Sequence, residues 1–139
     1  MTLAQIDEML PNGFHDAEVE QFIWNFQQNS AVFDIDFWIA TGDDHDREKR
    51  RRGRIELQEI AFIAIEPPDP RESDPRPYSS SLGTLQIDGS LADAKSFPQL
   101  PKLRPNLPAD AEIFSFYVVN WNSFIHISAI KARLVWRDA

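Results

Sequence analysis

The 139-residue chain has no cysteine, only three histidines and only five glycines, which are scattered singly. Without cysteine there are no disulfides, no thiolate catalysis and no zinc site built on cysteine. Scattered glycines provide no glycine-rich loop to hold a phosphate. Three histidines are too few for a His-Asp phosphohydrolase, which needs several of them as metal ligands. We therefore predict no metal, no cofactor and no catalytic residue set.

Long apolar segments are also missing. The longest uninterrupted apolar run covers residues 60–65, far short of the roughly 20 residues that a membrane-spanning helix needs. The first ten residues have no basic region followed by an apolar stretch, so we expect no signal peptide. These absences predict a cytoplasmic protein that has no membrane partner.

Charge is unevenly distributed along the chain. The formal net charge is −8, yet residues 47–54 (REKRRRGR) carry +5, which leaves −13 on the rest. An acidic body repels nucleic acid, and no aromatic residue in this segment could stack on a base. We expect a charged loop over residues 41–53, with a basic tip that is solvated or docks on an acidic partner. Its candidate residues are Arg50, Arg51, Arg52 and Arg54.

The strongest periodic signal lies in residues 14–40. Apolar residues alternate there with polar ones, first at Phe22, Trp24 and Phe26, then at Phe33, Ile35, Phe37 and Ile39. Alternation of this kind predicts strands that bury one face of a sheet. The polar residues 27–30 predict a turn between the two strands.

The remaining pattern predicts a mainly β protein of one domain, residues 1–139. Thr2 and Gln5 fit a capping box for a short helix over residues 3–10. We expect a bulge near Glu59, where one-sided alternation ends. About six strands should form a curved antiparallel sheet, either a sandwich or a partly closed barrel. They are predicted near residues 14–26, 31–40, 54–66, 84–90, 112–120 and 124–136, with proline-rich loops at 67–81 and 97–111.

Two histidines are candidates for chemistry. His15 and Asp16 stand at the start of the first strand, where neighbouring side chains face opposite ways and cannot form a dyad. We expect them to fix the strand start by bonding nearby backbone. His126 lies in the last strand without a Gly-x-Ser-x-Gly elbow, which favours a core or rim residue.

The predicted solvent-facing side of the two strands in residues 14–40 carries acids beside tryptophans. Asp34 and Asp36 are expected to meet solvent, and together with Trp24 and Trp38 they could form a patch that binds a partner. Trp121 lies in a predicted turn. We expect its side chain either to fold back onto the sheet or to protrude and bind a partner.

The stretch FHDAEVEQF, residues 14–22, followed by an alternating hairpin, resembles the opening of several small uncharacterised bacterial families. Some of these are assigned as immunity proteins of toxin systems. The likeness is carried by His15, Asp16 and Ala17 and by a last strand that ends in Trp136. It implies a non-enzymatic protein that binds a partner or has an unknown role, and no functional residue is carried over from it.

We therefore expect a bacterial binding protein that works through a protein partner or through self-association. One alternative is a β-sheet or barrel protein that holds a small ligand. Another is a hydrolase that uses His15 or His126 with carboxylates. That hydrolase would need the two histidines to converge in one cleft, or either of them to meet Asp34 or Asp36.

Overall fold

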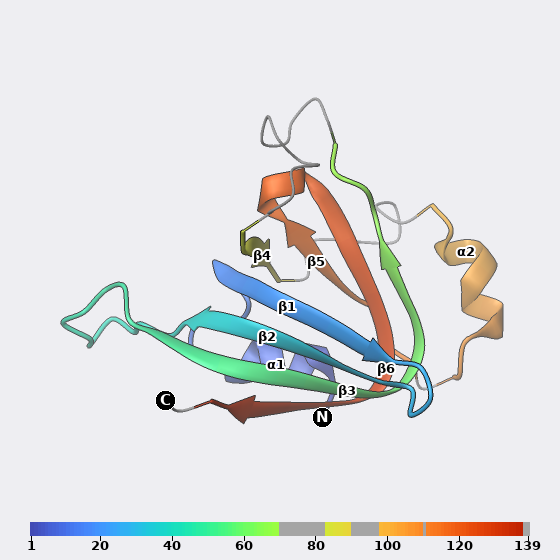
Figure 1. Ribbon diagram of the computed structural model, residues 1–139, viewed down its shortest axis with the longest axis horizontal. Helices are drawn as coiled ribbons and strands as arrows, with labels where there is room; N and C mark the ends of the chain where they lie inside the picture. The colour runs from blue at the N-terminus through green and yellow to red at the C-terminus, as the bar shows by residue number, and fades with distance from the viewer. Residues whose placement is uncertain (70–82, 90–97, 110, 138–139) are drawn as a thin grey trace.

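The computed structural model describes residues 1–69, 83–89, 98–109 and 111–137, and within them six antiparallel strands close into a barrel (Figure 1). The order around the barrel is β1-β2-β3-β6-β5-β4. This confirms the predicted mainly β class, and it selects the barrel over the sandwich. The strands are β1 (Ala17–Asn25), β2 (Ser30–Trp38), β3 (Arg50–Ile65), β4 (Leu85–Asp88), β5 (Phe114–Val118) and β6 (Ser123–Trp136).

The helices are short. The first, α1 (Leu3–Met9), begins with the predicted capping box between Thr2 and Gln5. The helices α2 (Leu100–Leu103) and η1 (Arg104–Asn106) replace part of the loop predicted over residues 97–111. Their prolines stand in first turns, where no backbone N–H is needed. Most of the loop predicted over residues 67–81 lies outside the described residues.

Strand β3 begins earlier than predicted, and a bulge near its middle shifts which of its side chains point into the core. The prediction of a loop up to Gly53 was wrong, because the strand already starts at Arg50. The bulge expected near Glu59 is confirmed: this residue has φ 53°, and the pairing with β6 shifts between Ile60 and Phe62. After Leu57, the next buried side chain is therefore Ile60, whereas simple alternation would have buried residue 59.

Aromatic rings fill the described interior of the barrel. Phe14, just ahead of β1, is fully buried, and its ring centroid lies 4.9–5.9 Å from those of Phe37, Phe114 and Phe116. Ring pairs at such separations add to the stability that burial provides. Buried side chains of α1 belong to the same core, which ties the helix to the barrel; they are Leu3 and Ile6.

The end of β1 departs from simple alternation. Its pairing with β2 shifts between Val19 and Gln21, and the strand ends at Asn25. Trp24 packs partly against the core, but Phe26 lies in the turn with 76% of its surface exposed. Phe26 therefore does not continue the buried face that the sequence pattern predicted.

Candidate functional site

Three of the four arginines predicted as a partner-facing loop bind acids on β1 and β2. Arg54 Nε donates to Asp34 Oδ1 at 2.9 Å, and Arg137 Nη1 lies 3.2 Å from the same oxygen. Hydrogen bonding to Asp34 and its negative charge raise the pKa of Arg54 above its usual value. Arg52 Nε donates to Glu20 at 2.9 Å. Asp34 is buried beneath these cations, so the expectation that it faces solvent was wrong.

Arg50 and Arg51 are also engaged within the chain. Arg50 Nη2 donates to the backbone carbonyls of Asp16 and Asp36, both at 2.9 Å, and its Nε lies 3.3 Å from the Asp36 carboxylate. The guanidinium of Arg51 lies 4.3 Å from the ring centroid of Trp136, a cation–π contact. The basic segment therefore stabilises the barrel wall rather than forming a free loop tip.

His15 and Asp16 meet a third polar residue at the end of β4. His15 Nδ1 lies 2.7 Å from Asp88 Oδ1, and its Nε2 lies 3.5 Å from Asp16 Oδ2. The same Asp88 oxygen accepts from the Asp16 amide at 3.2 Å, and Asp16 Oδ1 accepts from Gln86 Nε2 at 2.6 Å. The prediction that His15 and Asp16 cannot meet was wrong. Both lie in the turn before β1, and Asp16 has φ 55°.

These three residues have the composition of a possible metal site. Nitrogen or oxygen atoms of His15, Asp16 and Asp88 all lie within 4.8 Å of one another. One histidine and two carboxylates suit several divalent cations. In this arrangement, however, the imidazole and the Asp88 carboxylate already bind each other, which explains their closeness without an ion.

Trp38 stands beside this cluster. The ring centroids of His15 and Trp38 lie 5.9 Å apart, and Trp38 Nε1 donates to the carbonyl of Arg47 at 2.9 Å. Asn12 Nδ2 donates to the carbonyls of Trp38 and Ala40 at 3.0 and 2.8 Å. The turn that carries His15 is thus fastened to the end of β2.

Two surface grooves lie on either side of Asn12. One has a volume of about 610 Å³ and is lined by residues that include Asp7, His15 and Asp88. The other, of about 460 Å³, is lined by residues that include Trp38 and Arg47 as well as Asn12. His15 therefore lines one groove and Trp38 the other, and the two grooves meet at Pro11 and Asn12. We call this region the His15–Trp38 surface; it consists of Asp7, Asn12, His15, Trp38 and Asp88.

Glycines allow Asp7 to reach this surface. Its Oδ1 accepts from the Phe14 amide at 2.8 Å. A Cβ built on Gly89 would lie 2.9 Å from the same oxygen, and one on Gly13, where φ is 56°, only 2.4 Å away. Larger residues at either position would push the Asp7 carboxylate aside. No pattern in the sequence predicted this arrangement, because Gly89 lies far from Asp7 in the chain.

His126 belongs to a separate, buried network. Its Nδ1 lies 2.7 Å from Ser115 Oγ, and its Nε2 lies 2.8 Å from Glu66 Oε2. Glu66 Oε1 also accepts from the Phe124 amide at 3.3 Å. The residue types are those of a Ser-His-acid triad. Yet His126 is fully buried and Ser115 is 5% exposed, so the network links β5 and β6 to the residue after β3.

Sequence reasoning placed His126 correctly as a core residue but missed both of its partners. Ser115 stands opposite His126 in the β5–β6 pairing, a register that could not be read before the strands were paired. Neither histidine pairs with Asp34 or Asp36 among the described contacts, because those carboxylates bind arginines. The hydrolase alternative therefore stays a prediction without the convergence that it required.

The other predicted site residues lie in different places: some surround Arg50, whereas Trp24 and Trp121 lie elsewhere. Asp16, Asp36 and Trp38 surround Arg50, which pairs with Trp38 across β2 and β3. His15 lies beside Trp38. Trp24 lies near the β1–β2 turn and stacks on Phe26 at 4.9 Å. Trp121 lies in η2 (Val119–Trp121) and packs against the core, which confirms the fold-back that we expected as one of two outcomes.

The structure defines a small, mainly β protein built on a six-stranded antiparallel barrel with a short N-terminal helix. Its sequence matches no protein-family model and no curated protein. Among solved structures, the crystal structure of an uncharacterized protein from Neisseria gonorrhoeae is similar, with 11% identity and a TM-score of 0.44 over 86% of this chain and 90% of that one. A likeness this distant supports no functional argument. Within the described residues, no helix has both the length and the apolar character to cross a membrane.

Proposed function

We propose that this chain is a non-catalytic binding protein of the bacterial cytoplasm, and that it recognises a protein partner with the His15–Trp38 surface. The observation that carries the proposal is the setting of His15. Its side chain is 59% exposed and lies between an aspartate and the Trp38 indole ring. His15 lines one groove, and Trp38 lines the other. A rigidly held imidazole beside an apolar ring can bind a partner without further ordering.

The chemistry of the surface points to the character of the partner. Asp7, Asp16 and Asp88 present carboxylates around His15, and Trp38 supplies an apolar face. Such a surface suits a segment that offers hydrogen-bond donors, from lysine, arginine or free backbone amides, next to an apolar side chain. The resemblance of residues 14–22 to families that include immunity proteins supports a protein as the partner.

A paired capture and binding experiment tests this proposal. Wild-type protein and the His15→Ala/Trp38→Ala double variant are used to capture proteins from the native host, and the captured protein is then purified. We expect the double variant to bind the purified partner about tenfold more weakly or worse, since both truncated side chains would lie at the contact.

The control is Lys131→Ala, an exposed change on β6, which should leave the affinity unchanged. Circular dichroism and thermal melting check that each variant is folded. The proposal is wrong if the double variant binds the partner as tightly as the wild type, or if no partner is captured reproducibly.

The groove beside His15 also supports a second candidate function, the binding of a small ligand. Its volume of about 610 Å³ lies within the range of known ligand pockets, which is about 300–1,000 Å³. The rings around Phe14 occupy the described barrel interior, so a ligand would bind in this groove rather than inside the barrel. A thermal-shift screen of small molecules should then show hits with the wild type that His15→Ala abolishes.

A further inference from the structure

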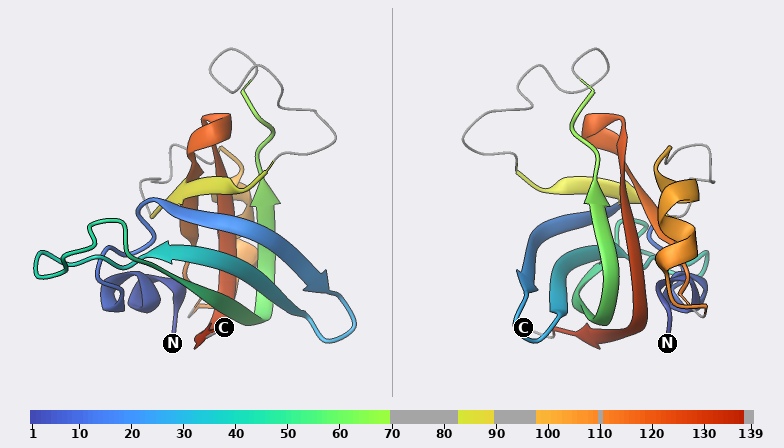
Figure 2. Two further views of the ribbon diagram at one scale, coloured as in Figure 1. Left: turned by 60° about the vertical axis from the view of Figure 1, so that its left-hand side comes forward. Right: turned by 90° about the vertical axis from the view of Figure 1, so that its right-hand side faces the viewer.

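Strand β1 is paired on both sides only over its first three residues. Residues 17–19 pair with β4, which is four residues long, and the register against β2 shifts directly afterwards. From Gln21 to Asn25 the strand pairs with β2 on one side. On its other side, the described residues provide no partner. The end of β1 and the turn to β2 project from the barrel (Figure 2).

This free edge lacks the usual protection against strand pairing. Sheet edges are normally blocked by charged residues, proline or a covering segment, because their open backbone groups can pair with another chain. Residues 21–33 contain no charged residue and no proline. Ile23 is 51% exposed on the strand, and Phe26 is 76% exposed in the turn that follows.

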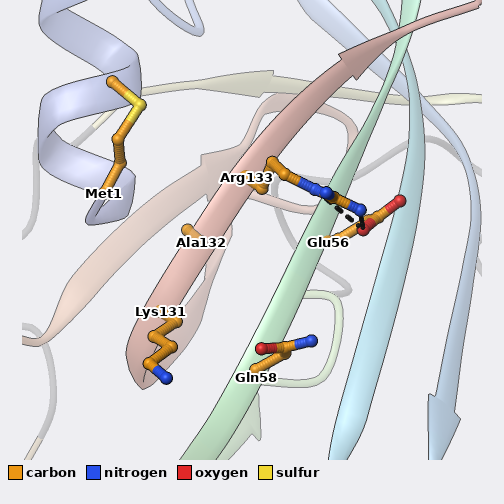
Figure 3. A pocket seen from close by; sticks show the side chains of 6 residues that line it. All are labelled: Met1, Glu56, Gln58, Lys131, Ala132 and Arg133. Carbon is orange, nitrogen blue, oxygen red and sulfur yellow. Dashed lines mark hydrogen bonds and ion pairs between the residues drawn. The ribbon is translucent and has the colours of Figure 1, made fainter.

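The second half of β6 shows the contrast. Its Ala132 amide donates to the carbonyl of Met1 at 2.7 Å, so the N-terminus occupies this edge. Lys131 and Arg133 flank that position, and Arg133 binds Glu56 on the neighbouring strand (Figure 3). The β6 edge is therefore covered and charged, whereas the β1 edge over residues 21–25 carries no charge and has no cover among the described residues.

We propose that a second copy of this chain adds its own β1 to this edge, antiparallel, about a two-fold axis at Ile23. Ile23 would then stand opposite Ile23 of the second copy. Phe22 would stand opposite Trp24 of the second copy, and Gln21 opposite Asn25. Aromatic and aliphatic side chains in such opposite positions stabilise a sheet.

The lack of like charges facing each other in this register favours a second copy as the partner. At the next position of this register, Glu20 would stand opposite the uncharged Phe26, and Glu18 is already paired with β4. No acid therefore faces an acid along the seam, although each chain carries a net −8. Only the uncharged stretch that starts at residue 21 lets two such acidic chains approach without direct repulsion.

The short length of the unpaired β1 edge limits the strength of the proposed dimer contact. Pairing with β4 and the register shift after Val19 confine the new pairs to residues 21–25. Five residues from each chain form a small interface, of the kind found in transient complexes. The dimer is therefore reversible and depends on protein concentration.

Disulfide trapping tests the register. The natural chain has no cysteine, so Ile23→Cys introduces a single thiol. Opposite residues in antiparallel strands have Cα atoms about 4.5–5.5 Å apart, within the range that a disulfide spans. We expect mild oxidation to convert Ile23→Cys into a covalent dimer. Val135→Cys, at an apolar β6 position that is 37% exposed, is the matched control and should stay monomeric.

Sedimentation velocity tests the association itself. The wild type should shift from monomer to dimer as its concentration rises, and Ile23→Lys should weaken this by about tenfold or more, because like charges would stand opposite each other. A wild type that stays monomeric, or equal trapping of Ile23→Cys and Val135→Cys, would overturn the inference. The His15→Ala/Trp38→Ala variant should dimerise like the wild type, which separates this inference from the proposed function.

Discussion

At the residue scale, the buried network of His126 makes a contribution to stability that can be tested. Both ring nitrogens have partners, Ser115 and Glu66, and the ring is fully buried. Removal of the imidazole leaves the Ser115 hydroxyl without this partner and creates a cavity. Each of these effects lowers stability.

We predict that His126→Ala lowers the free energy of unfolding by about 2–4 kcal/mol. Urea denaturation followed by circular dichroism measures this change. The control is His45→Ala, in the exposed loop between β2 and β3, which should change stability little. Equal stability of the two variants would show that the buried network contributes nothing.

The loop between β2 and β3 contains a carboxylate whose ionised form is favoured by folding. The Thr41 amide and then its hydroxyl donate to Asp44 at 2.8 and 3.1 Å, and Lys49 adds an attractive charge. These contacts lower the pKa of Asp44 below the usual value of 3.8. The contribution to stability is thus present above pH 3.8 and is lost as the pH falls through the folded-state pKa.

We predict that the Thr41 amide resonance titrates with a midpoint below 3.8 in an NMR pH series. Asp44→Asn should remove this titration. In the same series, Asp43→Asn, at the exposed neighbouring position, should leave the Thr41 titration unchanged. A midpoint at or above 3.8 would contradict the hydrogen-bonding explanation.

At the scale of elements, the junction of α1 with the turn before β1 depends on close packing against glycine. Asp7 binds the Phe14 amide and also lies next to Gly89, which directly follows β4. The helix, the turn and the strand therefore meet at one carboxylate. A side chain at residue 89 would separate them.

We predict that Gly89→Ala lowers the free energy of unfolding by about 1–3 kcal/mol, because its Cβ would displace Asp7. Chemical denaturation measures the loss. Gly42→Ala is the matched control, since its Cβ would have no neighbour within 4 Å. If Gly89→Ala is as stable as Gly42→Ala, the carboxylate is not held as tightly as the structure indicates.

The positions of the strands could be predicted because they depend on a local pattern. Alternation located all six, because burying one face of a sheet requires a period of two residues. The start of β3 was missed because arginines there suggested a solvated loop. Their acidic partners lie on β1 and β2, so these stabilising contacts appear only once the strands are paired.

At the scale of the whole molecule, arginines and acids pair within the barrel wall, whereas acids outnumber bases in the rest of the chain. Arg50 and Arg54 each meet an acid of the neighbouring strand β2, and Arg52 meets Glu20 of β1. The acids around His15 and the uncharged edge of β1 are the features that remain for other molecules. Because they lie on different elements, the partner-binding and self-association variants should act independently.

By itself, the sequence determined the mainly β class, the number of strands and the helix with its capping box, since these follow from local periodicity and local hydrogen bonding. It also marked His15, Asp16 and Trp38 as residues of interest. Only the tertiary structure decided that His15 and Asp16 meet Asp88, that His126 meets Ser115 and Glu66, and that the described residues leave the end of β1 unpaired on one side. Such contacts join residues far apart in the chain, and strand order and register bring them together.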